Sequence, residues 1–318
     1  MAPAIDVEDL TKDYKVGFWR PRPYRALDRL TLQVQPGEVF GFLGPNGAGK
    51  TTTLKLLMQL VFPTAGRASI LGRPVGDLGV RQRIGYLPEN PYFYDNLTAE
   101  ELLEYFASLF GYSRSDCQAR ASRLLDEVGL GAERRMQLRK YSKGMVQRVG
   151  IAQSLLNDPE VLFLDEPMSG LDPLGRRDIR ELILRLRERG TTIFFSSHIL
   201  SDAETLCSRV AIVAGGRLAT VGTLRDMSGF EVRGWEVVMT GVASTVLATL
   251  ASRGVKATTV ADGRYTFDLP KEASAEAFVA EMHAGGARLV SVAPVHTTLE
   301  EIFVQQVHKA GSAREGAL

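Results

Sequence analysis

A glycine-rich stretch near the start of the chain has the residue types and spacing needed to bind a nucleoside triphosphate. The sequence GPNGAGKT fits the pattern G-x-x-x-x-G-K-[ST], follows the apolar run Val39–Leu43 and precedes a helical pattern over residues 51–60. Small residues let backbone N–H groups approach phosphate oxygens, and a helix N-terminus adds partial positive charge. We expect this loop to bind the nucleotide through Gly44, Pro45, Asn46, Gly47, Ala48, Gly49, Lys50, Thr51 and Thr52. Within it, Lys50 can reach the β- and γ-phosphates, and the Thr51 hydroxyl can hold Mg²⁺.

Two adjacent acids follow a second apolar run, in the sequence VLFLDEP at residues 161–167. The carboxyl end of a strand is where α/β sheets bind ligands. Asp165 is therefore placed to hold Mg²⁺, and Glu166 to polarise the attacking water. A pair of acids can also simply end a strand in a solvated turn, but the phosphate loop upstream favours a hydrolytic site.

Three further motifs stand in a fixed order around this acidic run: YSKGMVQR at 141–148, SGLD at 169–172 and SSH at 196–198. Together with the phosphate loop they resemble the ABC ATPases over roughly residues 4 to 225. The resemblance implies an ATP- and Mg²⁺-dependent hydrolase that works as two copies packed head to tail. It implies that the nucleotide of one copy meets a helix tip of the other, formed by Ser142, Lys143, Gly144 and Met145. Ser142 can also cap this helix.

Other roles follow from the same resemblance. His198 is expected to orient the γ-phosphate and the attacking water, completing a catalytic set with Glu166 and Lys50. Asp172 is expected to couple the two nucleotide sites. Tyr14 falls where the family places an aromatic ring against adenine, although an ordinary half-buried strand residue is the alternative interpretation.

The chain departs from the family pattern at two places. The usual L-S-G-G-Q reads Y-S-K-G-M, which keeps the two positions that contact phosphate. Glu89 replaces the usual glutamine; it can still bind Mg²⁺, but it adds negative charge beside Asp165 and Glu166. Both departures resemble the branch of ABC ATPases that serves drug, polysaccharide, lipid and sodium exporters, which often carries a small C-terminal domain ending near TTLEEIF.

The order of the predicted elements gives the fold class and the domains. Residues 1–228 alternate strand and helix patterns, which predicts an α/β P-loop NTPase with a helical subdomain that carries the signature motif. Residues 229–310 follow the order β-α-β-β-α-β-α, which predicts a small α+β ferredoxin-like domain. A capping box at Thr298 and Glu301 is expected to begin the last helix, and residues 311–318 are expected to form a flexible tail.

Composition limits the partners. With 318 residues, 45% of them hydrophobic, and a net charge of +1, the chain has no electrostatic reason to bind nucleic acid, and none is expected. No run approaches the roughly 20 apolar residues of a membrane span. The resemblance to the ABC ATPases implies the partners: a second ATPase copy, either the same chain or a related one, and an integral-membrane permease that holds the chain at the inner face of the cell membrane. The alternative is an ABC-type ATPase that acts without a permease, on ribosomes, DNA or cofactor assembly.

One insertion stays open at this stage. The sequence GFWRPRPYR at residues 17–25 interleaves arginines with aromatic residues. It is compatible with contact to anionic lipid or a permease, with stacking on single-stranded nucleic acid, or with a solvated hairpin tip.

Overall fold

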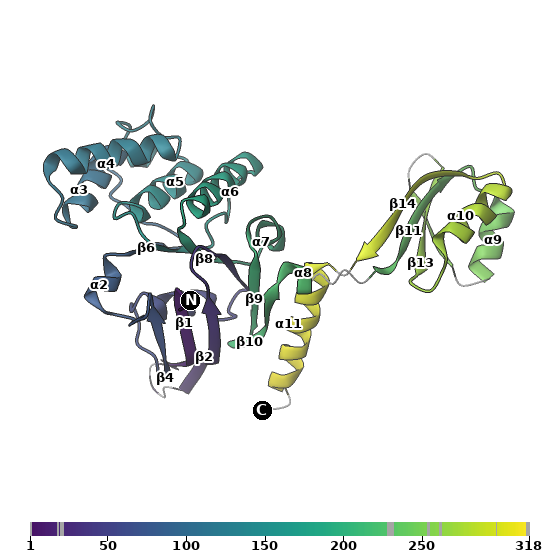
Figure 1. The fold of residues 1–318 in the computed structure, drawn as a ribbon, viewed down its shortest axis with the longest axis horizontal. Helices are drawn as coiled ribbons and strands as arrows, with labels where there is room; N and C mark the ends of the chain where they lie inside the picture. Colours follow the sequence, from purple (N-terminus) through teal and green to yellow (C-terminus); the bar gives the residue numbers. More distant parts are fainter. Residues whose placement is uncertain are drawn as a thin grey trace. The chain divides into compact units, whose positions relative to one another are not determined.

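The computed structural model describes residues 2–17, 19, 22–227, 232–252, 255–260, 263–296 and 298–315. The chain divides into two compact units (Figure 1). The first unit is Met1–Leu224 together with Phe303–Leu318, and the second is Arg225–Ile302. The domain boundary expected at residues 228 and 229 lies outside the described residues.

A six-stranded sheet forms the centre of the first unit, in the order β10-β9-β3-β8-β7-β6. Five of its strands are parallel, and β10 pairs antiparallel with β9. Their bounds are β3 Val39–Leu43, β6 Ile84–Leu87, β7 Val161–Asp165, β8 Thr192–Ser197, β9 Arg209–Ala214 and β10 Arg217–Thr223. Every residue of β3, β7 and β8 is buried, as expected of parallel strands covered on both faces. The continuous apolar runs of the sequence predicted this correctly.

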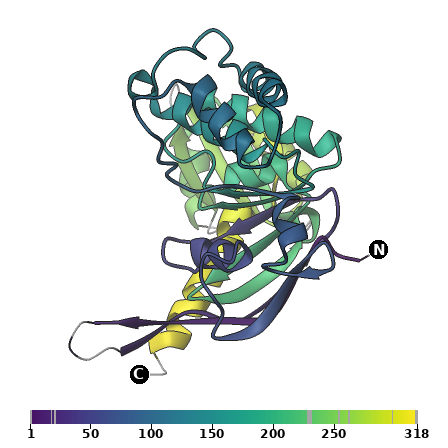
Figure 2. The same ribbon diagram turned by 90° about the vertical axis from the view of Figure 1, so that its left-hand side faces the viewer.

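A second, antiparallel sheet has the order β2-β1-β4-β5, and α3 to α6 lie on the other side of the central sheet (Figure 1). Its strands are β1 Ile5–Val16, β2 Arg22–Val34, β4 Ala65–Ile70 and β5 Arg73–Pro74. Figure 2 shows β1 and β2 projecting together as a long hairpin. Of the insertion at its tip, Phe18, Arg20 and Pro21 lie outside the described residues, and the Trp19 side chain is 91% exposed.

The helices of the first unit cover the central sheet and carry the signature motif. They are α1 Lys50–Leu57, α2 Leu78–Arg81, α3 Ala99–Ser108, α4 Arg114–Glu127, α5 Lys143–Ser154, α6 Pro173–Glu188 and α7 Leu200–Leu206, with a 3₁₀ turn at Leu138–Lys140 and α8 Leu224–Met227 at the boundary. Phe194 of β8 packs against Phe40, Phe42 and Phe163 at centroid distances of 5.2–5.8 Å, which ties β3, β7 and β8 into one core. None of the described helices is long and apolar enough to cross a membrane.

The second unit has the predicted βαββαβ order, followed by a helix. Its elements are β11 Val232–Thr240, α9 Ser244–Ser252, β12 Lys256–Val260, β13 Arg264–Pro270, α10 Ala275–Ala284 and β14 Arg288–His296, followed by the start of α11 Leu299–Glu315. From Phe303 onward, α11 belongs to the first unit. The sheet order is β12-β13-β11-β14, antiparallel throughout. The capping box of α11 is present, since Glu301 N donates to Thr298 Oγ1 at 3.2 Å and Thr298 N donates to Glu301 Oε2 at 3.4 Å. The helix continues to Glu315, so most of the expected flexible tail is helical instead.

Candidate functional site

A cavity of about 600 Å³ opens at the carboxyl ends of β3, β7 and β8, where the sequence motifs converge. Parallel pairing brings these ends together: Leu43 is level with Ser197, and Asp165 with Ser196. The cavity is lined by Tyr14, Tyr24, Ala26, Pro45, Asn46, Gly47, Gly49, Lys50, Thr51, Thr52, Glu89, Glu166, Ser169 and His198. Seven residues of the phosphate loop thus share one cavity with the predicted catalytic and adenine-side residues.

Glycines shape the phosphate loop where other residues would not fit. A Cβ on Gly44 would lie 2.5 Å from the Val213 carbonyl oxygen. Gly49 has φ +105°, a left-handed conformation that side chains rarely adopt, and it stands immediately before α1. The loop can therefore lie close to β9 and still enter the helix.

Lys50 is buried at the base of the loop. Its Nζ donates to the Gly44 carbonyl at 2.7 Å and to the Pro45 carbonyl at 3.3 Å, and lies 3.2 Å from Glu166 Oε1. The ammonium group is thus fixed between the loop backbone and the acid at the end of β7.

Asp165 presents oxygen atoms of the kind that bind a hard cation. Its Oδ1 accepts from Ser196 Oγ at 2.6 Å and from Thr51 Oγ1 at 3.4 Å. Its Oδ2 is buried and has no hydrogen-bond partner among the described residues. Burial raises the pKa of this carboxyl, and the negative charges of Glu89 and Glu166 add to the rise, against the hydrogen bonds from Ser196 and Thr51. An unsatisfied, crowded carboxylate beside a threonine hydroxyl fits a divalent cation.

Glu166 occupies a strained position that the surrounding strands support. Its φ is +49°, in the left-handed region, which disfavours such a residue by about 1 kcal/mol or more. Glu166 N donates to Ser196 Oγ at 3.0 Å and to the Ser196 carbonyl at 3.2 Å. The carboxylate accepts from His198 N at 3.3 Å, and its Oε2 lies 2.8 Å from His198 Nδ1. The bend turns Glu166 into the cavity, although Asp165 still belongs to β7.

Two tyrosine side chains also line the cavity. Tyr14 and Tyr24 are cross-strand partners in the β1–β2 hairpin, and both line the cavity. Sequence reasoning found Tyr14 and missed Tyr24, since only the hairpin register pairs the two. It also missed Ser169, and gave no role to Ser196 although this serine stands within the SSH motif.

The residues expected to meet a second copy lie outside the lining of this cavity. Ser142 is exposed and caps α5, its Oγ accepting from Met145 N at 3.3 Å, as predicted. Lys143 is exposed and extends over Gly170, where an added Cβ would lie 2.3 Å from Lys143 Nζ. Asp172 caps α6 by accepting from Gly175 N at 3.0 Å, a local role that sequence reasoning had not assigned to it.

A hydrogen bond connects the helix α5, whose start carries Ser142 to Met145, with the segment that follows Glu166. Buried Gln147 Nε2 donates to the Pro167 carbonyl at 3.0 Å, one residue after Glu166. Sequence reasoning missed this glutamine, because nothing in its spacing separates it from other polar helix residues.

Comparisons with known proteins agree with this geometry. The family model described as "ABC transporter" matches residues 27–169. An uncharacterised ABC transporter ATP-binding protein of Synechocystis is 46% identical over 98% of this chain and 86% of its own length. This chain belongs to the ABC transporter ATP-binding proteins.

Two further comparisons concern export and the dimer. The fluoroquinolones export ATP-binding protein of Mycobacterium tuberculosis is 43% identical over 64% of this chain and 66% of its own length. A dimeric, post-hydrolysis structure of the ATP-binding cassette MJ0796 with ADP and phosphate has a TM-score of 0.64 and 28% identity, covering 71% of this chain and all of that one. As a member of this family the chain binds ATP, is an ATPase, dimerises as a cassette and pairs with a membrane permease.

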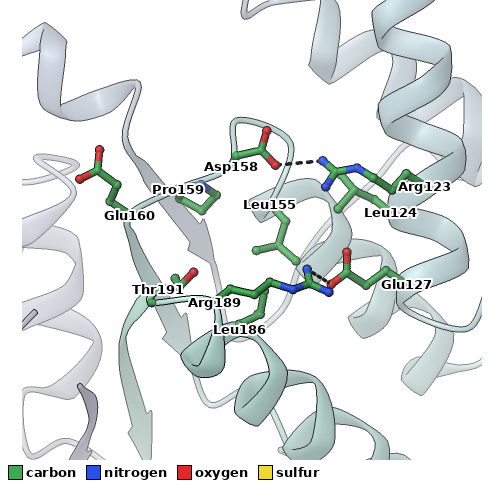
Figure 3. Close-up of a pocket in the computed structure, with 11 residues that line it drawn as sticks. Arg123, Leu124, Glu127, Leu155, Asp158, Pro159, Glu160, Leu186, Arg189 and Thr191 are labelled. Carbon is green, nitrogen blue, oxygen red and sulfur yellow. Dashed lines mark hydrogen bonds and ion pairs between the residues drawn. The ribbon is translucent and has the colours of Figure 1, made fainter. Parts of the chain in front are cut away.

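A second cavity, of about 310 Å³, lies at the amino ends of β7 and β8, away from the phosphate loop (Figure 3). Two ion pairs cross it: Arg123 to Asp158 at 2.9 Å and Arg189 to Glu127 at 2.5 Å. They connect α4 with the turn before β7 and with the end of α6. This cavity therefore lies between the helical subdomain and the central sheet. None of the phosphate-binding residues line it.

The raised pKa of Asp165 makes a stability prediction. Since the folded chain holds this proton more tightly than the unfolded chain, the free energy of unfolding falls as pH rises from about 4, the ordinary carboxyl value, through the raised pKa. Asp165→Asn lacks this effect. Without divalent cations, its melting temperature relative to wild type should rise by about 2–4 °C between about pH 4.5 and about pH 7.5.

Circular dichroism melting curves measure this difference, with the exposed Asp178→Asn as the control that should show no such trend. If the melting temperature of Asp165→Asn minus that of wild type stays constant or decreases as pH rises, the ionised Asp165 carboxylate does not destabilise the folded chain, and the assignment is contradicted.

Proposed function

We propose that this chain powers an exporter, hydrolysing Mg²⁺-ATP between two copies at the inner face of the cell membrane. The observation that supports this most directly is the convergence of Lys50, Thr51, Asp165, Glu166 and His198 at one end of the central sheet. The substrate would be bound by the permease, so its chemical nature is left to that subunit.

Mg²⁺ is proposed to bind Thr51, Asp165 and Glu89. Asp165 Oδ2, which has no partner in the described ranges, and the raised pKa of the carboxyl support this, because a cation would satisfy the oxygen and offset the crowded negative charge. The ion would neutralise charge on the β- and γ-phosphates.

The protein groups divide the remaining work. Lys50 is proposed to bind the β- and γ-phosphates, and Glu166 to accept a hydrogen bond from the attacking water. His198, 2.8 Å from the Glu166 carboxylate, orients that carboxylate and contacts the γ-phosphate. Tyr14 stacks on adenine, and its cross-strand neighbour Tyr24 extends the same wall.

A second copy is proposed to complete each site. Ser142 to Met145 form a helix start outside the cavity lining, exposed at Ser142 and Lys143, and such a start favours an anion. In a head-to-tail pair this helix start would face the γ-phosphate of the other copy, with Asp172 and its turn at the shared face. Residues 1–228 form this ATPase domain in our proposal, and residues 229–310 form an accessory domain.

The direction of transport is inferred from a similar protein, and the location at the membrane is inferred from exposed aromatic side chains. The similar Mycobacterium protein is named for fluoroquinolone export, which supports the outward direction. The loop after Glu89 carries two exposed rings, Tyr92 at 91% and Tyr94 at 63%, whereas Phe93 between them is 9% exposed and belongs to the core. We assign Tyr92 and Tyr94 to the surface that docks the permease, since aromatic rings are frequent anchors of interfaces.

Glu166→Gln tests the hydrolytic assignment. Glutamine keeps the shape but removes the carboxylate that polarises water, so turnover should fall at least about a hundredfold while Mg²⁺-ATP is retained. Size-exclusion chromatography should then show an ATP-dependent dimer. Lys50→Ala should lose both turnover and the dimer, because the phosphate contact is gone. A Glu166→Gln chain that hydrolyses ATP at the wild-type rate would show that Glu166 does not have this role.

Tyr92→Ser with Tyr94→Ser tests the docking surface. Losing two exposed anchors should reduce recovery of the permease with the tagged chain from detergent extracts by about tenfold. Phe62→Ser is the matched control, since Phe62 is 68% exposed but lies after α1 rather than after Glu89. Equal recovery with the Tyr92/Tyr94 variant and the control would place the docking surface elsewhere, and recovery with ribosomes or DNA alone would favour action without a permease.

A further inference from the structure

One buried carboxylate near the site has no part in the reaction described above. Asp202, in the first turn of α7, is 0% exposed, and neither carboxylate oxygen has a hydrogen-bond partner among the described residues. A buried ionised carboxylate is unfavourable unless opposite charge lies close by. An ionised Asp202 therefore requires a positively charged group close to its carboxylate.

Two arginines of α6 supply that positive charge. Arg180 Nη2 lies 3.2 Å from Asp202 Oδ1, and Arg180 Nε is itself buried and makes no hydrogen bond within the part of the chain that the structure describes. Burial raises the pKa of Asp202; the charges of Arg180 and of Arg176, one helical turn earlier on α6, oppose that rise, and the charge of Glu166 adds to it. The carboxylate thus holds α7 against α6 by charge rather than by well-formed hydrogen bonds.

Each end of this contact reaches a functional segment. On the α6 side, Arg176 Nε donates to the Leu171 carbonyl at 3.2 Å, within the SGLD turn that also contains the cavity residue Ser169. On the α7 side, Asp202 follows His198 by four residues, and His198 contacts Glu166. Asp202 thus ties α7, which begins two residues after His198, to α6 through Arg180, and Arg176 of the same α6 holds the SGLD turn.

We propose that Asp202 is a positioning residue that fixes the SGLD turn relative to His198. It reaches no phosphate-binding atom and acts through the arginines. Arg176 holds the turn from the first part of α6, and Asp202 holds α6 against α7 through Arg180. A displacement of the turn at the shared face is therefore passed through α6 and α7 to the histidine beside Glu166. This inference rests on the proposed roles of Glu166, His198 and the shared face.

Asp202→Asn in the full-length chain tests the inference, because asparagine keeps the volume and removes the charge. The kcat for ATP should fall about tenfold through misplacement of the catalytic groups, while the Kd for ATP stays within about twofold of wild type. Asp178→Asn is the matched control. It removes a carboxylate from α6, the helix that carries Arg176 and Arg180. The Asp178 side chain is 52% exposed and lies 3.7 Å from Arg148, and its replacement should keep wild-type turnover.

A second variant separates positioning from general loss of stability. Arg176→Gln should lower kcat to a similar extent, and the double variant should be no slower than the slower single variant, within about twofold, because both break one path. The inference is overturned if the kcat losses of the two single variants multiply in the double variant. It is also overturned if the kcat of Asp202→Asn stays within about twofold of wild type. If circular dichroism shows that Asp202→Asn is unfolded, Arg176→Gln alone decides: a lowered kcat with unchanged Kd supports the inference, and an unchanged kcat overturns it.

The proposed function and this inference can fail separately. If Glu166→Gln keeps wild-type turnover, the proposed site is wrong and the inference falls with it. If Glu166→Gln is inactive but Asp202→Asn turns over normally, only the inference is wrong.

Discussion

The buried ion pair between Lys50 and Glu166 is the contact on which the rest of the site depends. Lys50 comes from the phosphate loop after β3, and Glu166 from a left-handed bend after β7, yet their charged atoms lie 3.2 Å apart. Two opposite charges at this depth stabilise each other only when their positions are tightly fixed. The neighbouring groups serve that end: loop carbonyls hold Lys50, and Ser196 and His198 hold Glu166. A site that binds phosphate and directs water thus arises from one fixed pair of charges.

The parallel sheet fixes the positions of Lys50 and Glu166. Since β8 lies between β3 and β7, one strand aligns the phosphate loop with the acidic bend, and Phe194 packs against phenylalanines of both neighbours. The polar contacts that tie the helical subdomain to this frame include Gln147 to the turn after Glu166, Arg148 to Asp178, and the ion pairs across the cavity of Figure 3.

The sequence was most informative where one chemical need restricts residue type. The phosphate loop, the acids of VLFLDEP and the capping serine at 142 were each predicted at the right place, because few residues can supply those backbone shapes and charges. The cavity residues Tyr24 and Ser169 were not found, since their roles come from strand register and from a turn geometry that spacing does not encode. Asp202 looks like an ordinary acid of an amphipathic helix until its burial is seen. The length of α11 was underestimated because a polar composition does not by itself exclude a helix.

Crosslinking between two copies tests the central claim, that each ATP is shared, most directly. Asn46→Cys in the phosphate loop and Ser142→Cys at the start of α5, combined in a Glu166→Gln chain, should form a disulfide-linked dimer under mild oxidation with Mg²⁺-ATP and the permease. Pairing Asn46→Cys with Arg114→Cys, at the start of α4, should not. A dimer that fails to link through Asn46 and Ser142 under these conditions, or that links equally through Arg114, would contradict the shared site.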